Sequence, residues 1–170
     1  MITLEKLDTL SASEFVSTLE QVYEHSPWVV EAVAGARPFA NLKVLQAACE
    51  SALYGADPEI QMELIKAHPD LAAKLDQLPK LTDFSQAEQR RAGFAALAPE
   101  VLERMRVALA VYRERFGHPF ILCVTEHPAE DVLPLLELRC QSTADAERLA
   151  CLYQIARIGW YRINGLVREA

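Results

Sequence analysis

Apolar residues recur along this chain at intervals of three and four, and this spacing constrains the fold more than any other feature. In residues 99–116 the interval joins Val101, Met105 and Leu109, and Gly117 follows directly. Residues three or four apart share one face of an α-helix, whereas a half-buried strand alternates apolar and polar residues. A glycine just past the last apolar residue is typical of a helix C-terminus. We therefore predict a helix over residues 99–116.

The rest of the chain shows the same pattern between its glycines, prolines and capping residues. Ser11 and Glu14 have the spacing of a capping box, and Ser26-Pro27 offers a cap followed by proline at the first helical position. The stretch 75–83 is expected to be a loop, and 118–124 a buried connecting segment. Further helices are predicted near residues 11–22, 27–35, 41–54, 58–67, from Ser85 onward, 131–140 and 142–167, the last with an apolar face of Leu149, Leu152, Ala156, Trp160 and Ile163. The fold class predicted is all-α, with about seven to nine helices.

Composition limits the domain count and the partners. The 170 residues, 51% of them hydrophobic and without a linker-like stretch, predict one compact domain over residues 1–170. The formal net charge of −7 argues against nucleic acid or anionic membrane as a partner. No apolar run reaches the roughly 18 residues that cross a bilayer, and the N-terminal residues do not resemble a signal peptide. Four scattered cysteines without a CxxC pair predict reduced, structural thiols. We expect a cytoplasmic protein.

His68 is the first candidate for chemistry. It precedes Pro69, and a residue before proline is disfavoured in the helical region, so His68 is expected at the end of a helix. A histidine in such a place is more often a capping or surface residue than a catalyst. A helix C-terminus, however, favours the cationic imidazole and a following helix N-terminus disfavours it, and either effect moves a proton-transfer group near neutral pH.

Two further segments are open to either a structural or a functional interpretation. Ser85 and Glu88 form a capping box that needs no ligand, yet a helix start also presents free backbone N–H groups, and Gln89 adds an amide beside them. Residues 116–121 combine a helix stop with buried chain, whose backbone polar groups must be satisfied, by the protein or by a planar polar ligand. Both interpretations remain open from the residues alone.

Arg157 lies beside Ala156 but about 100° further round the last helix, so it borders the apolar face. Its guanidinium either reaches solvent over an apolar stem or offers a planar fork to a carboxylate. A metal site is not expected, because His118, Glu126 and His127 lack a familiar ligand spacing. The chain also has no GxGxxG, P-loop or GxSxG motif.

Four segments together resemble the family of 2-oxo-4-hydroxy-4-carboxy-5-ureidoimidazoline (OHCU) decarboxylases. They are His68-Pro69-Asp70-Leu71-Ala72, Leu81-Thr82 with Ser85, Glu88 and Gln89, Phe116-Gly117-x-Pro119-Phe120-Ile121, and Ile155-Ala156-Arg157. The resemblance implies an all-α enzyme, often a homodimer, that forms (S)-allantoin and carbon dioxide from an intermediate of urate degradation without a cofactor. It implies His68, Glu88 and Arg157 as catalytic residues. The positions that match substrate-contacting residues of the family are Pro69, Ser85, Gln86, Ala87, Gln89, Phe120, Ile121, Leu122, Cys123 and Val124.

Two positions depart from the family pattern. His118 stands where phenylalanine is expected, which bears on the polarity of the pocket. The chain also reads Arg139-Cys140-Gln141 where the family often has Arg-x-x-Asn, at the end of a predicted helix. Two other functions remain alternatives: a non-enzymatic helical ligand-binding module, and an amidohydrolase acting on a related ureide.

Overall fold

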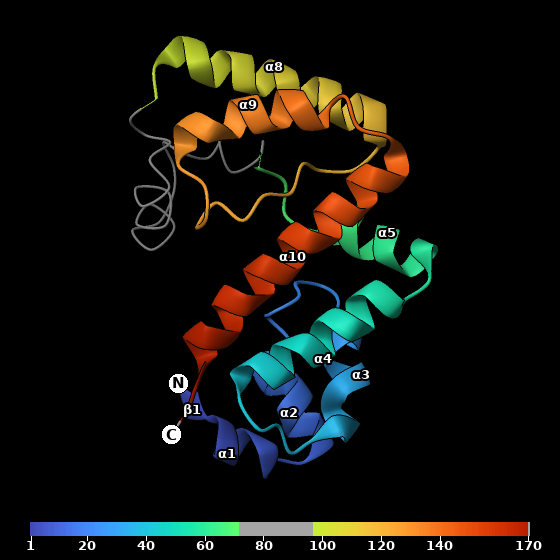
Figure 1. The fold of residues 1–170 in the computed structure, drawn as a ribbon, viewed down its shortest axis with the longest axis vertical. Helices are drawn as coiled ribbons and strands as arrows, with labels where there is room; N and C mark the ends of the chain where they lie inside the picture. Colours follow the sequence, from blue (N-terminus) through green and yellow to red (C-terminus); the bar gives the residue numbers. More distant parts are fainter. Residues whose placement is uncertain (72–96, 170) are drawn as a thin grey trace. The chain divides into compact units, whose positions relative to one another are not determined.

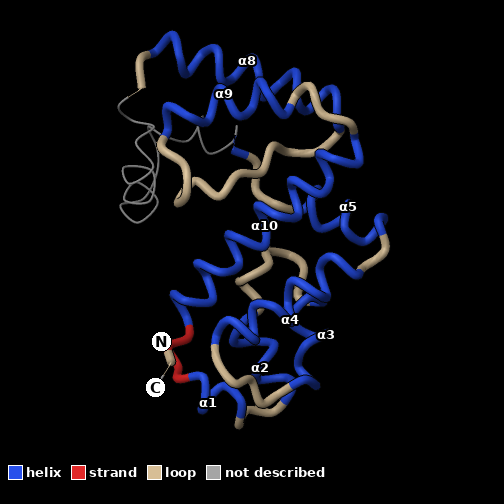
Figure 2. The backbone as a smooth tube through the Cα atoms, viewed as in Figure 1, coloured by secondary structure: helices blue, strands red, loops and turns tan. Residues whose placement is uncertain are grey.

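The computed structural model describes residues 1–71 and 97–169. In these two stretches the chain forms eight α-helices, one 3-10 helix and two strands of two residues each (Figures 1 and 2). The all-α prediction is confirmed. None of the described helices is both long and apolar enough to cross a membrane.

The elements follow one another with short connections over most of the described chain. In order they are β1 (Ile2–Thr3), α1 (Leu4–Asp8), α2 (Ala12–Leu19), α3 (Trp28–Val33), η1 (Ala34–Ala36), α4 (Leu42–Gly55), α5 (Pro58–Ala67), α8 (Pro99–Phe116), α9 (Ala129–Arg139), α10 (Ala144–Leu166) and β2 (Val167–Arg168). The strands β1 and β2 pair in parallel. The sequence did not predict this pairing, because a strand of two residues is too short to show an alternating pattern.

Several helix boundaries form as the capping residues predicted. The capping box of Ser11 and Glu14 is present. Asn41, predicted as part of the helix over 41–54, instead caps it, and its side chain accepts a hydrogen bond from the backbone N–H of Val44. Gly117 ends α8 in the left-handed conformation, with φ 72°. One prediction was wrong: α3 has Pro27 as its N-cap, with no side-chain cap, so Ser26 does not cap it.

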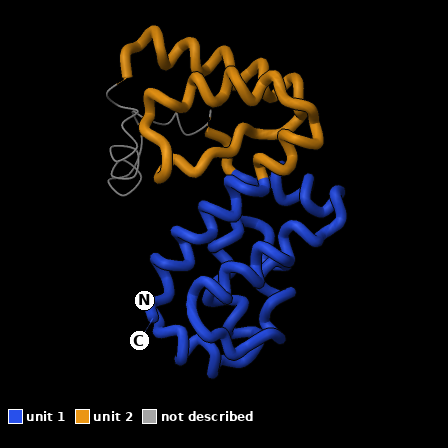
Figure 3. The backbone as a smooth tube through the Cα atoms, viewed as in Figure 1, with its two compact units in different colours: residues 1–68, 152–170 blue, residues 69–151 orange. Residues whose placement is uncertain are grey.

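The chain divides into two compact units, and each has its own buried core (Figure 3). Unit 1 comprises residues 1–68 and 152–170. In it α3 packs against α4, and its buried side chains include Phe15, Leu45, Ile65 and Leu152. The prediction of one domain over residues 1–170 stays a prediction.

Unit 2 comprises residues 69–151. Helices α8 and α9 pack together over a buried core formed by Leu71, Met105, Leu109, Tyr112, Phe120, Leu122, Ala129, Val132, Leu133 and Leu136. Helix α9 continues through Pro134, so this proline does not shorten the helix.

The predicted apolar face of α10 needs one correction. Leu152, Ala156 and Ile163 are buried as expected, but Leu149 is 51% exposed. Glu147 is buried in this part of the helix, at 0% exposure. A carboxylate can occupy this buried position because Arg139 pairs with it.

Candidate functional site

His68 ends α5 as the sequence predicted. Its backbone is extended, with φ −68° and ψ 140°, and its N–H donates to the carbonyl oxygen of Ile65 at 3.3 Å. Pro69 accounts for this conformation, because its ring excludes the helical region for the preceding residue. The residue is half-buried, so the helix end presents an imidazole that is only partly shielded from solvent.

The chain that follows His68 is held by an ion pair within unit 2. The Asp70 carboxylate contacts the Arg113 guanidinium of α8, and the Asp70 side chain is 21% exposed. Pro69 is half-buried. The motif that begins with His68 therefore contains a residue that ends the helix and a residue that ties the next segment to α8.

The second predicted group lies outside the described residues. It comprises Ser85, Gln86, Ala87, Glu88 and Gln89, together with the predicted loop over 75–83 and the helix from Ser85. These assignments stay predictions.

The segment Phe120–Val124 runs as irregular chain between α8 and α9 (Figure 2). Phe120, Ile121, Leu122 and Cys123 are buried and Val124 is half-buried, so the prediction of a buried connecting segment is confirmed. Its contact with a substrate stays a prediction.

Arg139, which the sequence did not indicate as a functional residue, is largely buried and contacts this segment. Arg139 Nη1 donates to the carbonyl oxygen of Ile121 at 2.7 Å, and the guanidinium lies 4.5 Å from the centroid of the Phe120 ring. Arg139 Nε and Nη2 donate to Glu147 Oε1 at 2.9 and 2.5 Å, and the Tyr112 hydroxyl donates to the same oxygen. The spacing of Arg139 and Glu147 in the sequence did not predict this ion pair, because the two residues lie on different helices, α9 and α10.

The electrostatics of this cluster fit a charged pair beside neutral groups. Burial by itself lowers the pKa of Arg139, but the hydrogen bond and charge of Glu147 outweigh it, and the pKa lies above its ordinary value. Burial, with Cys151 and Glu147 nearby, raises the pKa of Tyr112, and burial raises the pKa of Cys151 to about 11. The guanidinium is therefore a fixed cation at neutral pH, and the phenol and thiol are neutral.

His118, the first departure from the family pattern, packs into an aromatic cluster. It is 3% exposed, and its ring centroid lies 5.6 Å from that of Tyr112 in an edge contact and 5.9 Å from that of Phe116. Its Nδ1 lies at hydrogen-bond distance, 3.1 Å, from the carbonyl oxygen of Pro119. The ring nitrogen that His118 introduces thus contacts a backbone carbonyl oxygen of the protein itself.

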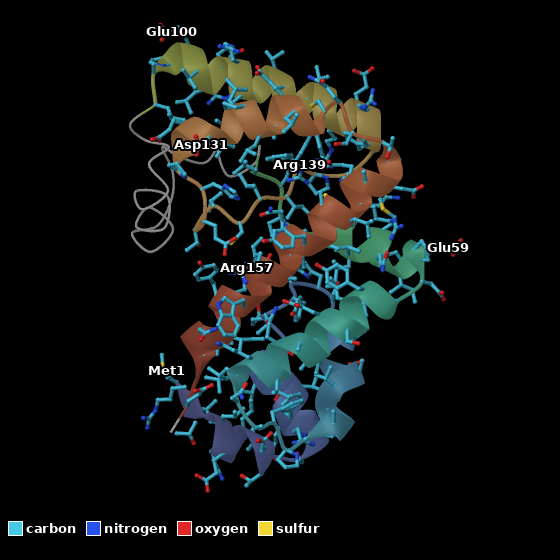
Figure 4. All side chains as sticks on the ribbon, in the orientation of Figure 1. Met1, Glu59, Glu100, Asp131, Arg139 and Arg157 are labelled. Atoms are coloured by element: carbon cyan, nitrogen blue, oxygen red, sulfur yellow. The ribbon has the colours of Figure 1, made fainter. Side chains whose placement is uncertain are left out.

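Arg157 lies on α10 in unit 1 and is half-buried (Figure 4). Its guanidinium carbon is 5.9 Å from the centroid of the Tyr161 ring. The helix is fixed at this point from two sides: Gln46 Nε2 donates to the carbonyl oxygen of Ala156 at 3.0 Å, and Gly159 lies against the Tyr23 ring. Both contacts hold the backbone that carries Arg157.

The described residues contain no group of three or more His, Cys, Asp or Glu side chains arranged to hold a metal ion. The four cysteines, all in described parts of the chain, are free thiols. The described site residues supply the imidazole of His68, the guanidinium of Arg157, the thiol of Cys123 and backbone polar groups.

Sequence comparison relates the chain to a family of decarboxylases. The family described as OHCU decarboxylase matches residues 8–164. The 2-oxo-4-hydroxy-4-carboxy-5-ureidoimidazoline decarboxylase of Haloferax volcanii is 32% identical over 162 residues, which cover 95% of this chain and 94% of that protein. The uric acid degradation bifunctional protein of Bacillus subtilis is also 32% identical, over 99% of this chain but only 33% of its own length.

A solved structure has the same fold. The crystal structure of an (S)-allantoin synthase superposes with a TM-score of 0.79 and 27% sequence identity, over 99% of this chain and 54% of that chain. The chain thus spans about half of that molecule and a third of the Bacillus protein.

Proposed function

The chain belongs to the OHCU decarboxylase family, and we propose that it converts OHCU into (S)-allantoin and carbon dioxide by means of His68, Glu88 and Arg157. The observation that carries the proposal is the family match over residues 8–164, which includes all three positions. The likeness to an (S)-allantoin synthase over nearly the whole chain supports the same product.

The substrate explains why we propose no cofactor. The carbon that loses its carboxylate also bears a hydroxyl group and adjoins a C=N bond. The electron pair released with carbon dioxide moves toward this imine, which takes the place of the electron sink that thiamine or pyridoxal phosphate provides elsewhere. What remains for the protein is to orient the substrate and to move protons.

His68 and Glu88 are proposed to move those protons. One removes the proton of the hydroxyl group as it becomes the lactam carbonyl, and one delivers a proton to a single face of the neighbouring carbon, which gives the S product. Support for His68 comes from its place at the end of α5, where the imidazole is half-buried. Positioned acid–base groups contribute roughly 10²–10⁴-fold to a rate.

Arg157 is proposed to hold the substrate carboxylate. A guanidinium offers two parallel N–H donors, which fit a carboxylate better than a lysine ammonium. A protein with a net charge of −7 needs such a local cation to bind an anionic substrate. Arg157→Lys should therefore raise KM at least tenfold, as the loss of a bidentate contact of about 1.4 kcal/mol or more predicts.

The remaining site residues and the assembly are part of the same proposal. We propose that residues 1–170 work as one domain, as a homodimer in the cytoplasm. The substrate-contacting set is proposed to comprise Pro69, Ser85, Gln86, Ala87, Gln89, Phe120, Ile121, Leu122, Cys123 and Val124.

The activity is tested with freshly generated OHCU, followed by circular dichroism with and without the protein. A faster reaction that yields optically active allantoin is expected. A folded sample that leaves the spontaneous rate unchanged would favour a binding module instead, and release of ammonia would favour an amidohydrolase.

The role of His68 is tested with a matched histidine. His127 also precedes a proline, two residues before α9 begins, and it is not among the proposed site residues. His68→Ala is expected to abolish stereospecific product formation in folded protein, whereas His127→Ala keeps the wild-type rate. Wild-type rates in His68→Ala would contradict the assignment.

A further inference from the structure

We propose that Arg139 is a positioning residue, which together with Glu147 and Tyr112 holds the carbonyl oxygen of Ile121 and so fixes the segment Phe120–Val124 for substrate binding. This inference rests on the proposed function, because it takes that segment to contact the substrate. All of these residues belong to unit 2.

The guanidinium donates to three partners, one of which is the Cys151 sulfur, 3.3 Å from Nη2. One side of the fork, Nε and Nη2, donates to Glu147 Oε1, and Nη1 donates to the Ile121 carbonyl oxygen. The flat face lies over the Phe120 ring. Lysine has a single ammonium and cannot make this set of contacts in one plane.

The connecting segment depends on this arginine because it belongs to no helix or sheet. Ile121 is buried, so its carbonyl oxygen needs an internal donor, because a buried polar group left without a partner destabilises the fold. The Phe120 ring is held from a second side by Tyr112, in an edge contact with centroids 5.1 Å apart. Backbone and side chain of adjacent residues are thus fixed by one cluster.

Glu147 and Tyr112 fix the arginine in turn. The Glu147 side chain is fully buried and that of Arg139 is 12% exposed, so the pair is shielded from solvent. The Tyr112 hydroxyl donates to the same carboxylate oxygen, and the ring lies in the core of unit 2. The cluster connects α8, α9 and α10 to the connecting segment through one guanidinium.

The test uses the full chain with Arg139→Lys and Glu147→Gln. In protein shown to be folded by circular dichroism at the assay temperature, we expect kcat/KM for freshly generated OHCU to fall about 10–100-fold, largely through KM, since small displacements of positioning groups have effects of this size. Cys123 provides a readout independent of activity. It is buried, and its labelling by a thiol reagent, followed by mass spectrometry, is expected to become faster in both variants.

The matched control is an exposed ion pair in the same unit. Arg104 and Glu137 join α8 to α9 at 3.0 Å, with side chains 66% and 49% exposed. Arg104→Lys and Glu137→Gln make the same chemical changes and are expected to leave KM and Cys123 labelling at wild-type values. If Arg139→Lys does not fold, Tyr112→Phe carries the test, because it removes only the hydroxyl contacts with Glu147 and Cys151 and keeps the ring, and it is expected to shift KM in the same direction.

The outcomes separate this inference from the proposed function. A wild-type protein that does not accelerate decarboxylation defeats the proposed function. With an active wild type, folded variants that keep KM and Cys123 labelling unchanged overturn the positioning role. If Arg139 has a purely structural role, activity falls only in proportion to the amount of folded protein and KM does not change. This result also overturns the positioning role.

Discussion

Gly159→Ala tests how tightly α10 is packed near Arg157. A Cβ atom at position 159 would lie 2.8 Å from the Tyr23 hydroxyl oxygen and 2.9 Å from its Cε1 and Cζ atoms. Ordinary van der Waals contact begins near 3.4 Å, so the ring or the helix has to move. Tyr23 is 2% exposed, which leaves its ring little room.

Two opposing effects set the magnitude of this change. Overpacking of a well-packed core costs about 1–3 kcal/mol, whereas replacing glycine by alanine within a helix gains up to about 1 kcal/mol. The net effect at position 159 is therefore between neutral and about 3 kcal/mol of destabilisation. Because the two effects oppose each other, a control that isolates the helical gain is needed.

Gly165 supplies that control within the same helix. A Cβ atom there meets nothing within 4 Å, so Gly165→Ala has only the helical gain, reduced by its place near the helix end. Urea unfolding should give Gly159→Ala a free energy of unfolding about 1–3 kcal/mol below that of Gly165→Ala. In thermal unfolding each kcal/mol corresponds to roughly 2–4 °C for a chain of this length.

The packing argument also predicts a rescue and a functional effect. Tyr23→Leu removes the ring atoms that the new methyl group meets. Gly159→Ala should therefore destabilise the Tyr23→Leu variant less than it destabilises the wild-type protein. Because Gly159 lies two residues after Arg157, we expect KM to rise in Gly159→Ala and to stay unchanged in Gly165→Ala. Equal stability of the two alanine variants would refute the reasoning.

Three further predictions concern pH, an ion pair and a helix cap. Burial raises the pKa of Cys49 to about 12 and that of Cys151 to about 11, from an ordinary value near 9. Above pH 9 the unfolded chain therefore binds fewer protons than the folded chain. The free energy of unfolding should fall by up to about 1.4 kcal/mol per pH unit for each thiol, until the pKa of that thiol in the folded state is reached. Urea titrations from pH 8 to 11 measure this decline, and Cys49→Ala should make it shallower. Asp70→Asn should lower stability by about 0.5–1 kcal/mol, since Arg113 is largely exposed, and a double-mutant cycle with Arg113→Gln should give a coupling of that size. Ser11→Ala removes a capping hydrogen bond and should cost about 1 kcal/mol in urea unfolding, with no change in activity.

Local rules predicted the parts of the fold that depend on neighbouring residues. Pro69 places His68 at a helix end, and Gly117 ends α8, because both effects act on adjacent backbone. The helix over 99–116 was predicted with its observed bounds. These features need no information about distant parts of the chain.

Features that depend on distant residues were not predictable in this way. The apolar pattern of α10 placed Leu149 in the core, whereas Glu147 is buried there. A charged residue is normally excluded from a core unless it is paired, and the partner, Arg139, lies on another helix. The same holds for the pairing of Ile2 with Val167, which joins the two ends of the chain.

The same distinction between neighbouring and distant residues applies to the candidate site. Its residues were identified by resemblance, residue by residue, but the reasons for their positions came from contacts between elements. Asp70 illustrates this: the motif contains it without a stated role, and its ion pair with Arg113 gives it one. Predicted site residues 85–89 lie outside the described residues, so their assignment still rests on the resemblance alone.

The two departures from the family pattern differ in consequence for a physical reason. His118 replaces an expected phenylalanine with a ring of similar flatness, which keeps its edge contact with Tyr112 and directs a ring nitrogen to the Pro119 carbonyl. In the second departure Arg139 itself is present, and the asparagine of the pattern is replaced by Ser142, which is half-buried. Since the contact to Ile121 is made by the Arg139 guanidinium, it does not involve the side chain at position 142.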